Sequence, residues 1–517
     1  MKKTLSFLHH DIQETGPQYL EDLATAYWFS EVLFTSVEME IFSLIEEKGA
    51  SVDTRSRTLK VHPQGLKRFL QALSAMGLVT KQDKTYFNTQ VASDYLVRGR
   101  EHYQGDSILW RKFLHLSWKG ISECLKKGRK ADYAGHDSSW KRMNRIRKYI
   151  SAMDSIAKIK SKEILGFFEG QPLKGEILDV GAGSGAIAAA FLEHFPLTKA
   201  VLLDLPDILD YTREILVDKS LDGRMRYCPG NVLEPWPVRK GTFDLVILSN
   251  IVHAYSEKEL PHILMSASDC LRKKGIVVIH DFFLEHSPEK AALSDLNMFL
   301  NTFNGRIFSG KLVQDELCRL GLSCTDLIAL KTDTAVLFAS KDKRALGALH
   351  IEAVDLLSSR ILAIGFRKVY RITTEDIHIS DWTDLRCRFG CDRYGSPRCP
   401  PNSPTSQKTR DIVRDYKYAL LLEGEPPTKV FQQRVLQAER ETFKAGFYKA
   451  FSYWAGPCSL CKSCATNGVC TNTANARPSM EGAGIDVFET VRRAGATVRT
   501  LKNKDSFIKY FALILLG

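Results

Sequence analysis

The spacing of hydrophobic positions along this chain of 517 residues changes several times, and each change predicts a different element. Over Gly65–Met76 apolar side chains recur at the spacing of an amphipathic helix, and Gly77 predicts its end. Two short apolar runs, Leu78–Thr80 and Tyr86–Asn88, then flank a polar turn and predict a β-hairpin. Helices followed by such a wing are typical of a winged helix, which we expect over residues 15–100.

Residues 101–170 are predicted to be helical and to carry an aromatic-rich face, formed by Trp110, Phe113, Leu116 and Trp118. Such a face belongs more often to a protein core than to a ligand pocket. A lid over a pocket is the alternative interpretation.

From residue 176 to about residue 340, apolar runs of strand length alternate with helical patterns, as in a parallel α/β sheet. The predicted strands are Ile177–Val180, Ala200–Asp204, Leu245–Ser249, Ile276–Asp281 and Ala335–Ala339. The charged residues 341–344 predict a junction, after which a third unit begins near residue 345.

The composition excludes several classes of protein. Hydrophobic residues make up 44% and charged residues 26%, as in folded globular proteins rather than disordered or collagen-like chains. No apolar run approaches the ~18 residues of a membrane span. The longest runs, near Ile361–Phe366 and Phe511–Leu516, have the length of strands. The formal charge of +12 lies in no long Lys/Arg block, which favours a solvated surface over nucleic-acid binding. Because His9, His10 and Asp11 interrupt any signal-peptide core, we expect a cytoplasmic protein.

A glycine-rich turn follows the first predicted strand of the α/β region, and a helix is expected after it over Ala186–His194. The turn contains Gly181, Gly183 and Gly185. Glycine lets the backbone approach a ligand closely. The spacing G-x-G-x-G differs from the G-x-G-x-x-G of dinucleotide folds, so a pyrophosphate is not the first ligand expected. Asp204 ends the next strand, 25 residues after Asp179, where an acid can accept both ribose hydroxyls of an adenosine.

Four segments in this order resemble the S-adenosylmethionine-dependent O-methyltransferases of the winged-helix type: Asp179–Gly185, Leu203–Pro206, Gly230–Pro237 and Leu248–His253. That family includes plant phenolic and acetylserotonin O-methyltransferases and bacterial relatives, and the resemblance extends over residues 15–340. It implies methyl transfer to a hydroxyl group of an aromatic or heteroaromatic small molecule. It also implies a homodimer formed through the winged helix, which does not bind DNA in this family.

The resemblance implies a cofactor site as well. The three glycines would lie under the methionine part of S-adenosylmethionine, and Asp204 would hold its ribose. Asn231 stands where the family has an acid that contacts the adenine amine, and an amide oxygen can accept that hydrogen bond without a charge. The residues implied at the cofactor are Asp179, Gly181, Gly183, Gly185, Asp204, Leu205, Asn231, Val232, Ser249 and Asn250.

His253 stands where the family has its general base, with Ala254 and Tyr255 in place of the usual Asp and Trp. A histidine near its ordinary pKa can take a phenolic proton at neutral pH, whereas the alternative is a histidine satisfied in a loop or core. Asp281 follows the fourth predicted strand of this region, where the family has an acid that orients the base. The second family acid is missing from the later loop, Asn304–Ser309, so catalysis would depend more on proximity and on an acidic substrate.

Seven of the twelve cysteines lie close together in the C-terminal third: Cys387, Cys391, Cys399, Cys458, Cys461, Cys464 and Cys470. The C-x2-C-x2-C run wraps a loop around an iron–sulfur cluster in bacterial ferredoxins, where a distant Cys-Pro completes a cluster, and Cys399 precedes Pro400. Zinc sites more usually pair two separate C-x2-C units. We therefore expect a four-iron four-sulfur cluster first, zinc second and unliganded thiols third. One cluster with three spare thiols remains open, as do two clusters with a non-cysteine ligand or an open iron.

Residues 350–517 also resemble uncharacterised predicted metal-binding proteins from anaerobes, on the segments Cys387–Gly395, Cys399–Pro401 and Arg477–Asp486. That resemblance implies a metal and no reaction. The expected architecture is an α/β protein with three domains. These are a winged-helix dimerisation domain (15–100), a Rossmann-like class I methyltransferase domain with a helical lid at 101–170 (101–344), and a cysteine-rich α+β metal-binding domain (345–517).

Two functions remain open at this point. The first is an O-methyltransferase with a fused iron–sulfur domain, acting on a small hydroxylated acceptor and binding neither nucleic acid nor membrane. The second is a redox-sensing or electron-transfer protein whose methyltransferase half only binds cofactor, and it would need a redox partner. A radical S-adenosylmethionine enzyme is disfavoured because its usual C-x3-C-x2-C motif is absent.

Overall fold

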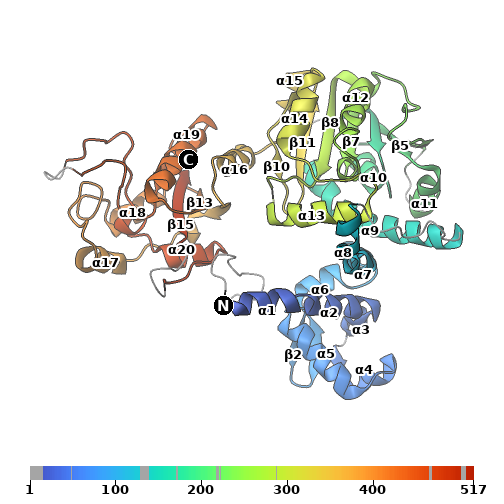
Figure 1. The fold of residues 1–517 in the computed structure, drawn as a ribbon, viewed down its shortest axis with the longest axis horizontal. Helices are drawn as coiled ribbons and strands as arrows, with labels where there is room; N and C mark the ends of the chain where they lie inside the picture. Colours follow the sequence, from blue (N-terminus) through green and yellow to red (C-terminus); the bar gives the residue numbers. More distant parts are fainter. Residues whose placement is uncertain are drawn as a thin grey trace. The chain divides into compact units, whose positions relative to one another are not determined.

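The computed structural model describes residues 16–517 except residues 48, 129–138, 171–172, 217–220, 222, 287, 465–468 and 502–507. The chain divides into two compact units, one that contains residues 17–350 and another that contains residues 351–517. Figure 1 shows the fold and labels many of the helices and strands.

The first unit begins with a small helical domain closed by a three-stranded antiparallel sheet in the order β1-β3-β2. Its elements are α1 (Pro17–Thr25), α2 (Tyr27–Glu38), α3 (Ile41–Ile45), β1 (Ala50–Ser51), α4 (Val52–Leu59), α5 (Pro63–Ala75), β2 (Val79–Gln82), β3 (Thr85–Asn88) and α6 (Gln90–Tyr95). Helix α5 begins at a proline, and Gly77, whose φ is +74°, lies just beyond its end. Leu66, Leu70 and Leu73 of α5 are buried in one cluster with Tyr86 of the hairpin. The predicted winged helix is therefore confirmed.

The rest of the first unit is built around an eight-stranded sheet in the order β10-β11-β8-β7-β4-β5-β6, with β9 paired to β11. Its strands are β4 (Gly175–Val180), β5 (Thr198–Asp204), β6 (Met225–Pro229), β7 (Phe243–Ser249), β8 (Leu271–Asp281), β9 (Ser323–Cys324), β10 (Ile328–Ala329) and β11 (Ala335–Ser340). All five predicted strands are present, whereas β6, β9 and β10 were not predicted.

The prediction of a parallel sheet is wrong at one edge, because β11 runs antiparallel to β8. Strand β8 ends at Asp281 and β11 begins opposite that residue, at Ala335, so β11 runs back along its neighbour. The other strands from β8 to β6 are parallel to one another. The result is the mixed sheet of a Rossmann-like methyltransferase domain, whose carboxyl strand ends share one edge.

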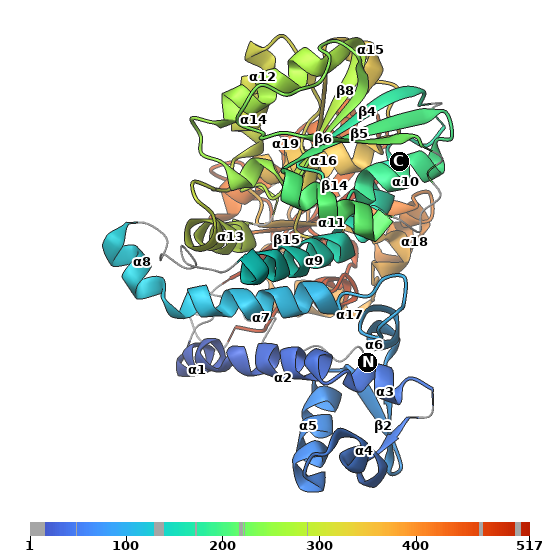
Figure 2. The same cartoon turned by 90° about the vertical axis from the view of Figure 1, so that its right-hand side faces the viewer.

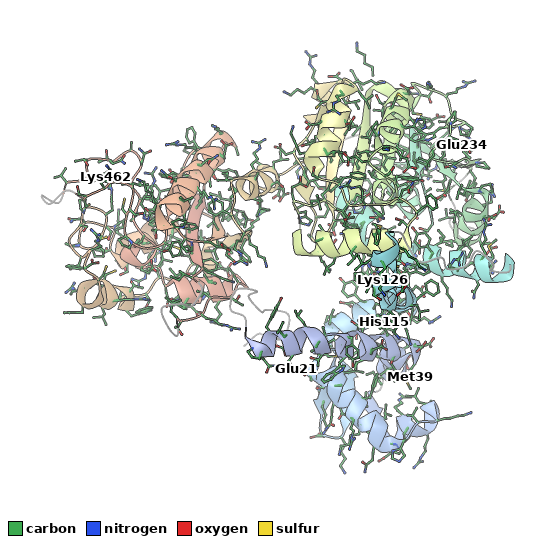
Figure 3. All side chains as sticks on the ribbon, in the orientation of Figure 1. Glu21, Met39, His115, Lys126, Glu234 and Lys462 are labelled. Atoms are coloured by element: carbon green, nitrogen blue, oxygen red, sulfur yellow. The ribbon has the colours of Figure 1, made fainter. Side chains whose placement is uncertain are left out.

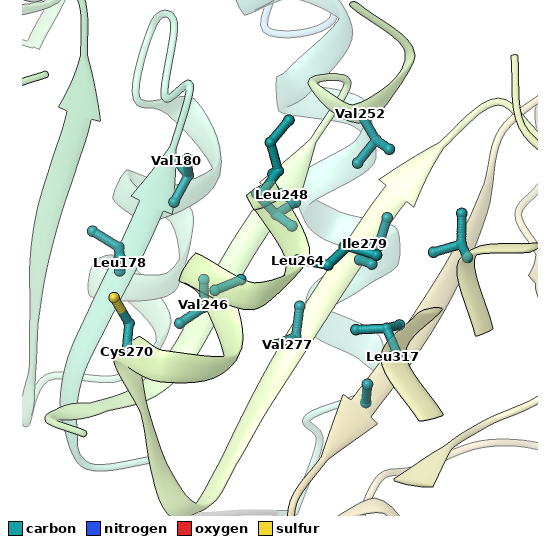
Figure 4. Packing of buried hydrophobic residues seen from close by; sticks show 14 of the residues in the cluster. Leu178, Val180, Val246, Leu248, Val252, Leu264, Cys270, Val277, Ile279 and Leu317 are labelled. Atoms are coloured by element: carbon teal, nitrogen blue, oxygen red, sulfur yellow. The ribbon is translucent and has the colours of Figure 1, made fainter. Parts of the chain in front are cut away.

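The helices of this part of the chain are α7 (Gly105–Lys119), α8 (Ile121–Lys127), α9 (Ser139–Gly166), α10 (Ala186–His194), α11 (Pro206–Leu216), the short η2 (Val252–Ala254), α12 (Leu260–Cys270), α13 (Pro288–Asn301), α14 (Gly310–Arg319) and α15 (Lys343–Leu346). Helices α12 and α10 pack directly on opposite faces of the sheet. On one face, alternate side chains of β4, β7 and β8 pack with Leu264 of α12 and Leu317 of α14 (Figure 4). On the other, the Phe168 ring meets those of Phe191 and Phe338 edge to face. Helix α7 lies between α2 and α9 (Figure 2).

The second unit has a four-stranded antiparallel sheet in the order β12-β13-β15-β14. Its elements are α16 (Ala353–Ala363), β12 (Lys368–Thr373), η3 (Thr374–Asp376), α17 (Trp382–Gly390), α18 (Ser406–Val413), β13 (Tyr418–Gly424), α19 (Thr428–Lys444), β14 (Phe451–Tyr453), η4 (Glu481–Ala483), α20 (Val487–Arg493) and β15 (Tyr510–Leu516). The apolar run Phe511–Leu516 forms most of the central strand β15, and every one of its residues is buried. The α+β class predicted for this region is confirmed.

The other long apolar run, near Ile361–Phe366, is not a strand. Its first three residues end helix α16, because Val354, Leu357 and Ile361 are buried at helical spacing on one face of that helix. None of the helices in the described part of the chain combines the length and the apolar composition needed to cross a membrane.

Candidate active site and cysteine groups

The glycine-rich turn connects β4 to α10, and two of its glycines are required by crowding. A Cβ added to Gly181 would lie 2.5 Å from Cδ1 of Ile251, and one added to Gly185 would lie 2.9 Å from Cδ1 of Leu216. At Gly183 the same atom would have only Cδ1 of Ile150 within 4 Å, at 3.9 Å. All three glycines have positive φ angles. The turn is therefore packed on two sides and leaves open space above Gly183, which a cofactor could occupy.

Asp204 ties this turn to the end of β5. Its Oδ2 accepts a hydrogen bond from the backbone N–H of Gly183 at 2.9 Å, and its Oδ1 accepts one from the N–H of Leu205 at 2.7 Å. Burial raises the pKa of Asp204. Burial also raises the pKa of Asp179, which lies at the base of the turn, to about 8, and the nearby charge of Asp204 acts in the same direction. The two acids thus lie against the glycine turn, as their positions in the sequence suggested.

The other residues expected at the cofactor lie at the carboxyl ends of β5, β6 and β7, with Leu205 directly after β5. Asn231 and Val232 follow β6, where the Oδ1 of Asn231 accepts from the N–H of Leu233 at 3.0 Å and Val232 is buried. Asn250 follows β7 with a φ of +53°, and its Oδ1 is buried without a hydrogen-bond partner among the described residues. A left-handed backbone and an unpaired buried oxygen both cost free energy, and such features gather at ligand sites. They fit a cofactor that would satisfy this oxygen.

Ser249 is in hydrogen-bonding contact with a histidine side chain that the sequence pattern did not point to as a site residue. Its Oγ lies 2.8 Å from Nδ1 of His280, whose Nε2 lies 3.0 Å from Oγ1 of Thr334. Burial lowers the pKa of His280 to about 4, so this ring is neutral at physiological pH. Both of its nitrogens have partners within the sheet, which makes His280 a support of the strand ends.

His253 and Asp281 form a close pair at the carboxyl edge of the sheet. Nδ1 of His253 lies 2.5 Å from Oδ1 of Asp281, and the backbone N–H of His253 donates to Oδ2 of the same carboxylate at 3.2 Å. Burial acts to lower the pKa of His253, but the charge and hydrogen bond of Asp281 raise it above its ordinary value. Since Nδ1 faces Asp281, Nε2 is the nitrogen left to meet a substrate.

The loop that lacks the second family acid lies directly behind His253. A Cβ added to Gly305 would lie 2.5 Å from the backbone oxygen of His253, so the loop backbone itself fills this place. Asn304 donates to Oε1 of Glu259 at 3.3 Å. The other oxygen of Glu259 accepts from the N–H and hydroxyl of Ser256. Glu259 is therefore engaged with Asn304 of this loop and with Ser256.

Aromatic side chains of two helices line the same region. Trp110 of α7 stacks on Phe113 with ring centroids 5.0 Å apart and lies 5.3 Å from the ring of Tyr149 on α9. Burial raises the pKa of Tyr149 to about 12, and the charges of Asp204 and Asp281 contribute. Tyr149 thus lies within electrostatic range of both the cofactor acid and the acid that holds His253. Sequence reasoning missed it, because its position depends on how α9 crosses the sheet edge.

The seven clustered cysteines lie on two loops and one helix of the second unit, and all are free thiols. Burial, followed by the neighbouring thiols of Cys391 and Cys387, raises the pKa of Cys399 to about 11. Burial raises the pKa of Cys458 as well, and Cys461, Cys470 and Cys464 act in the same direction. Within the described residues no three His, Cys, Asp or Glu side chains meet at one point as ligands of a single ion do. The thiols are gathered but not closed around a common centre.

His378, the nearest upstream histidine to the cysteines, has a different partner. Its Nδ1 accepts a hydrogen bond from Nη2 of Arg493 at 3.0 Å, and its backbone N–H donates to the hydroxyl of Thr490. Both partners belong to α20. His378 is therefore engaged with that helix rather than with the thiols.

Three families match successive parts of the chain. Residues 21–98 match the O-methyltransferase dimerisation domain, and residues 132–311 match the O-methyltransferase domain. Residues 370–516 match the family described as "Predicted metal-binding protein (DUF2284)".

Among curated proteins, the chain is similar to the tetracenomycin polyketide synthesis 8-O-methyl transferase TcmO of Streptomyces glaucescens. The two are 25% identical over 302 residues, which are 57% of this chain and 88% of that protein. It is also similar to acetylserotonin O-methyltransferase of Bos taurus, at 25% identity over 305 residues, 56% of this chain and 87% of that protein.

Among solved structures, human N-acetylserotonin methyltransferase in complex with S-adenosylmethionine has the same fold, with a TM-score of 0.56. At 18% identity it covers 64% of this chain and 99% of its own. The chain thus combines the dimerisation domain and the catalytic domain of an O-methyltransferase with a C-terminal domain of a predicted metal-binding family.

Proposed function

We propose that this chain methylates a hydroxyl group on an aromatic or heteroaromatic small molecule, with His253 as the general base. The observation that carries the proposal is the His253–Asp281 pair, which lies at the same sheet edge as the glycine turn and Asp204. When bound, S-adenosylmethionine supplies a methyl group on a positively charged sulfur. The turn at Gly181–Gly185, Asp204 and the unpaired oxygen of Asn250 would hold this cofactor.

The residues of this chain would handle the proton of the acceptor. In methyl transfer the acceptor would lose its hydroxyl proton, and Nε2 of His253 would take it. Asp281 stabilises the imidazolium that forms, because its carboxylate already lies at Nδ1. The ring faces of Trp110 and Tyr149 suit a flat aromatic acceptor, and their helices α7 and α9 pack together. Holding the acceptor in line with the methyl group supplies the remainder of the rate.

The test compares wild type with His253→Ala on acceptors of graded hydroxyl pKa. General-base catalysis contributes ~10²–10⁴-fold, so turnover of weakly acidic acceptors should fall by that factor while cofactor affinity stays unchanged. The loss should shrink for acceptors that are already ionised, since they need no base. His262, whose side chain lies on α12, serves as a matched control through His262→Ala. A uniform loss across the series would remove His253 from the role of base.

We also propose that the second unit holds an iron–sulfur cluster. The supporting features are the C-x2-C-x2-C run and the burial of Cys399 among four other thiols. Protonated thiols must lose their protons on metal binding, so assembly should be favoured at higher pH. Anaerobic purification followed by iron, sulfide and zinc analysis tests this, and stoichiometric zinc without iron would contradict it. An electron-carrying role beside methyl transfer would need a redox partner.

A homodimer formed through the winged-helix domain completes the proposal. Large apolar side chains are exposed on its first two helices: Leu20 (66% exposed), Leu23 (53%), Tyr27 (55%) and Trp28 (56%). Exposed apolar surface of this kind marks protein interfaces, and the matched dimerisation domain lies over these helices. Sedimentation velocity should give a dimer for wild type and a monomer for the double variant Leu20→Asp, Trp28→Asp.

A further inference from the structure

The seven clustered cysteines belong to two separate segments of the chain. One segment carries four of them and the other carries three. Cys458 lies within electrostatic range of Cys461, Cys464 and Cys470, all on the loop that follows β14. Lys462 marks this loop in Figure 3. Four thiolates complete a cubane by themselves. The fourth thiolate of this group is therefore Cys470, and Cys399 is not needed to complete it.

The remaining three cysteines come from a different segment. Cys387 lies in the last turns of α17, Cys391 follows that helix, and Cys399 is buried in the turn before Pro400. The thiols that act most strongly on Cys399 are those of Cys391 and Cys387, ahead of Cys464 and Cys458. Three thiolates leave one position of a four-iron cluster without a protein ligand.

A carboxylate lies near the group formed by Cys387, Cys391 and Cys399. It belongs to Glu481, within the segment Arg477–Asp486 that resembles the predicted metal-binding proteins. Glu481 begins η4, which packs against α17, and it is a direct electrostatic neighbour of Cys387. The hydroxyl of Ser403 donates to the backbone oxygen of Gly482, which holds η4 against the loop just beyond Cys399. A Cβ added to Gly482 would lie 3.5 Å from Cδ of Pro400, which is ordinary contact distance, so η4 lies beside the loop that carries Cys399.

The carboxyl group of Glu481 has the charge of Arg386 nearby and accepts a hydrogen bond from its own backbone N–H, but one of its oxygens is unsatisfied. Its Oε2 is buried and has no hydrogen-bond partner among the described residues. A buried carboxylate oxygen without a partner is costly, and in proteins such groups are usually paired or bound to a metal. Carboxylate oxygens bind iron, so this oxygen can supply what three thiolates lack.

We propose that Cys387, Cys391, Cys399 and Glu481 form a second metal site, separate from the site of Cys458, Cys461, Cys464 and Cys470. The inference rests on the proposed iron–sulfur function and deepens it by giving the number of sites and a non-cysteine ligand. A multi-iron cluster binds each ligand to a different iron, so its ligands need not meet at one point. His378, the other non-cysteine candidate, is engaged with Arg493.

The experiment uses the full chain, purified without oxygen and reconstituted with iron and sulfide. Iron, sulfide and zinc contents and electron paramagnetic resonance spectra are compared for wild type, Glu481→Gln, Glu481→Cys and Cys399→Ser. Glu489→Gln is the matched control, because Glu489 lies on the neighbouring helix α20 and is paired with Arg492. Circular dichroism and thermal unfolding establish that each variant is folded.

Wild type should bind about eight irons, as two four-iron clusters. Glu481→Gln should lose about one iron and show the spectrum of an oxidised three-iron cluster, whereas Glu481→Cys should keep about eight irons. Cys399→Ser should lose the second site, which contains Cys399, and leave the site of Cys458, Cys461, Cys464 and Cys470 unchanged. The control should match wild type. Equal iron content and identical spectra for Glu481→Gln and wild type would overturn the assignment of Glu481.

Other outcomes separate this inference from the iron–sulfur proposal itself. About four irons in wild type, unchanged by Cys399→Ser, would overturn the second site while the iron–sulfur proposal stands. Zinc without iron would contradict the iron–sulfur proposal. In that case a loss of about one zinc in Glu481→Gln would still support Glu481 as a ligand, and an unchanged zinc content would reject it.

Discussion

The methyltransferase site and the cysteine-rich site differ in how far contacts within the protein hold their functional groups in place. In the first, polar groups stand at the ends of buried strands and already have protein partners: Asp204 holds the glycine turn, and Asp281 holds His253. In the second, most thiols stand on loops, and Cys461 and Cys464 are exposed. The comparison teaches that the first site is organised by the sheet, whereas the order of the second depends on what its thiols bind.

The largest expected effect follows directly from this difference. Removing the metal should unfold the loops that carry the cysteines, because structural metal sites contribute roughly 10 kcal/mol to folding. The first unit should remain folded and bind S-adenosylmethionine with unchanged affinity. Hydrogen exchange read by mass spectrometry, before and after anaerobic chelation, measures both units in one sample. An equal loss of protection from hydrogen exchange in both units would show that the metal does not order the cysteine loops more than it orders the first unit.

A smaller effect is expected from Asp281→Asn, which tests whether the active site is preorganised. The asparagine keeps the shape but loses the charge, so turnover should fall by about 10²-fold or more, within the range of general-base effects. Calorimetry should show unchanged cofactor affinity, and Asp315→Asn, at an exposed acid of α14 paired with Lys311, serves as a control for the loss of an acid elsewhere in the domain.

The pH dependence gives a second readout of the same variant. Because Asp281 raises the pKa of His253 above 6.5, the unprotonated base of wild type appears only above that raised pKa, and the rate should rise with pH there. In Asp281→Asn only burial remains, which lowers the pKa, so the rising limb should move to lower pH. The stability of the folded protein changes with pH in the opposite direction to the rate. The stability that the charged pair contributes is fully present below the unfolded pKa and is lost as pH rises through the folded pKa. If the rising limb of the pH–rate profile stays in place in Asp281→Asn, the rate is not governed by the protonation of His253.

Asp204→Ala should weaken S-adenosylmethionine binding by roughly 1.5–3 kcal/mol, the scale of hydrogen bonds to a charged group. The carboxylate also accepts from the N–H of Gly183, so part of this loss would come from a loosened turn. Comparison with Asp204→Asn separates the lost contact with the cofactor from the loosened turn, because the amide oxygen can keep one backbone hydrogen bond. Isothermal titration calorimetry gives the affinities, and equal values for wild type and Asp204→Ala would move the ribose site elsewhere.

The smallest effect concerns Asn231, where the chain departs from its family. Asn231→Asp restores the acid and should tighten S-adenosylmethionine binding by about 0.5–1.5 kcal/mol, the difference between a neutral and a charge-assisted hydrogen bond. The backbone geometry should not change, because the N–H of Leu233 can donate to either side chain. Weaker binding would mean that Asn231 is adapted to its own contacts rather than a substitute for the acid.

Local sequence determined much of this protein. The glycine turn and helix Ala186–His194 follow directly from local pattern, since glycine spacing and apolar run length depend on neighbours in the chain. The same is true of the wing and the five main strands. The run near Ile361–Phe366 was misjudged because a short apolar run fits a strand as well as a buried helix end.

Only the tertiary structure decided which distant groups meet. The antiparallel return of β11, the electrostatic influence of Asp204 and Asp281 on Tyr149 and that of Glu481 on Cys387 all join segments far apart in the chain. No local pattern encodes such meetings, because they depend on how helices and loops pack across the sheets. The cysteine spacing alone left the number of sites open. The packing of η4 on α17 brings a buried, unpartnered carboxylate to the three thiols that lacked a fourth ligand.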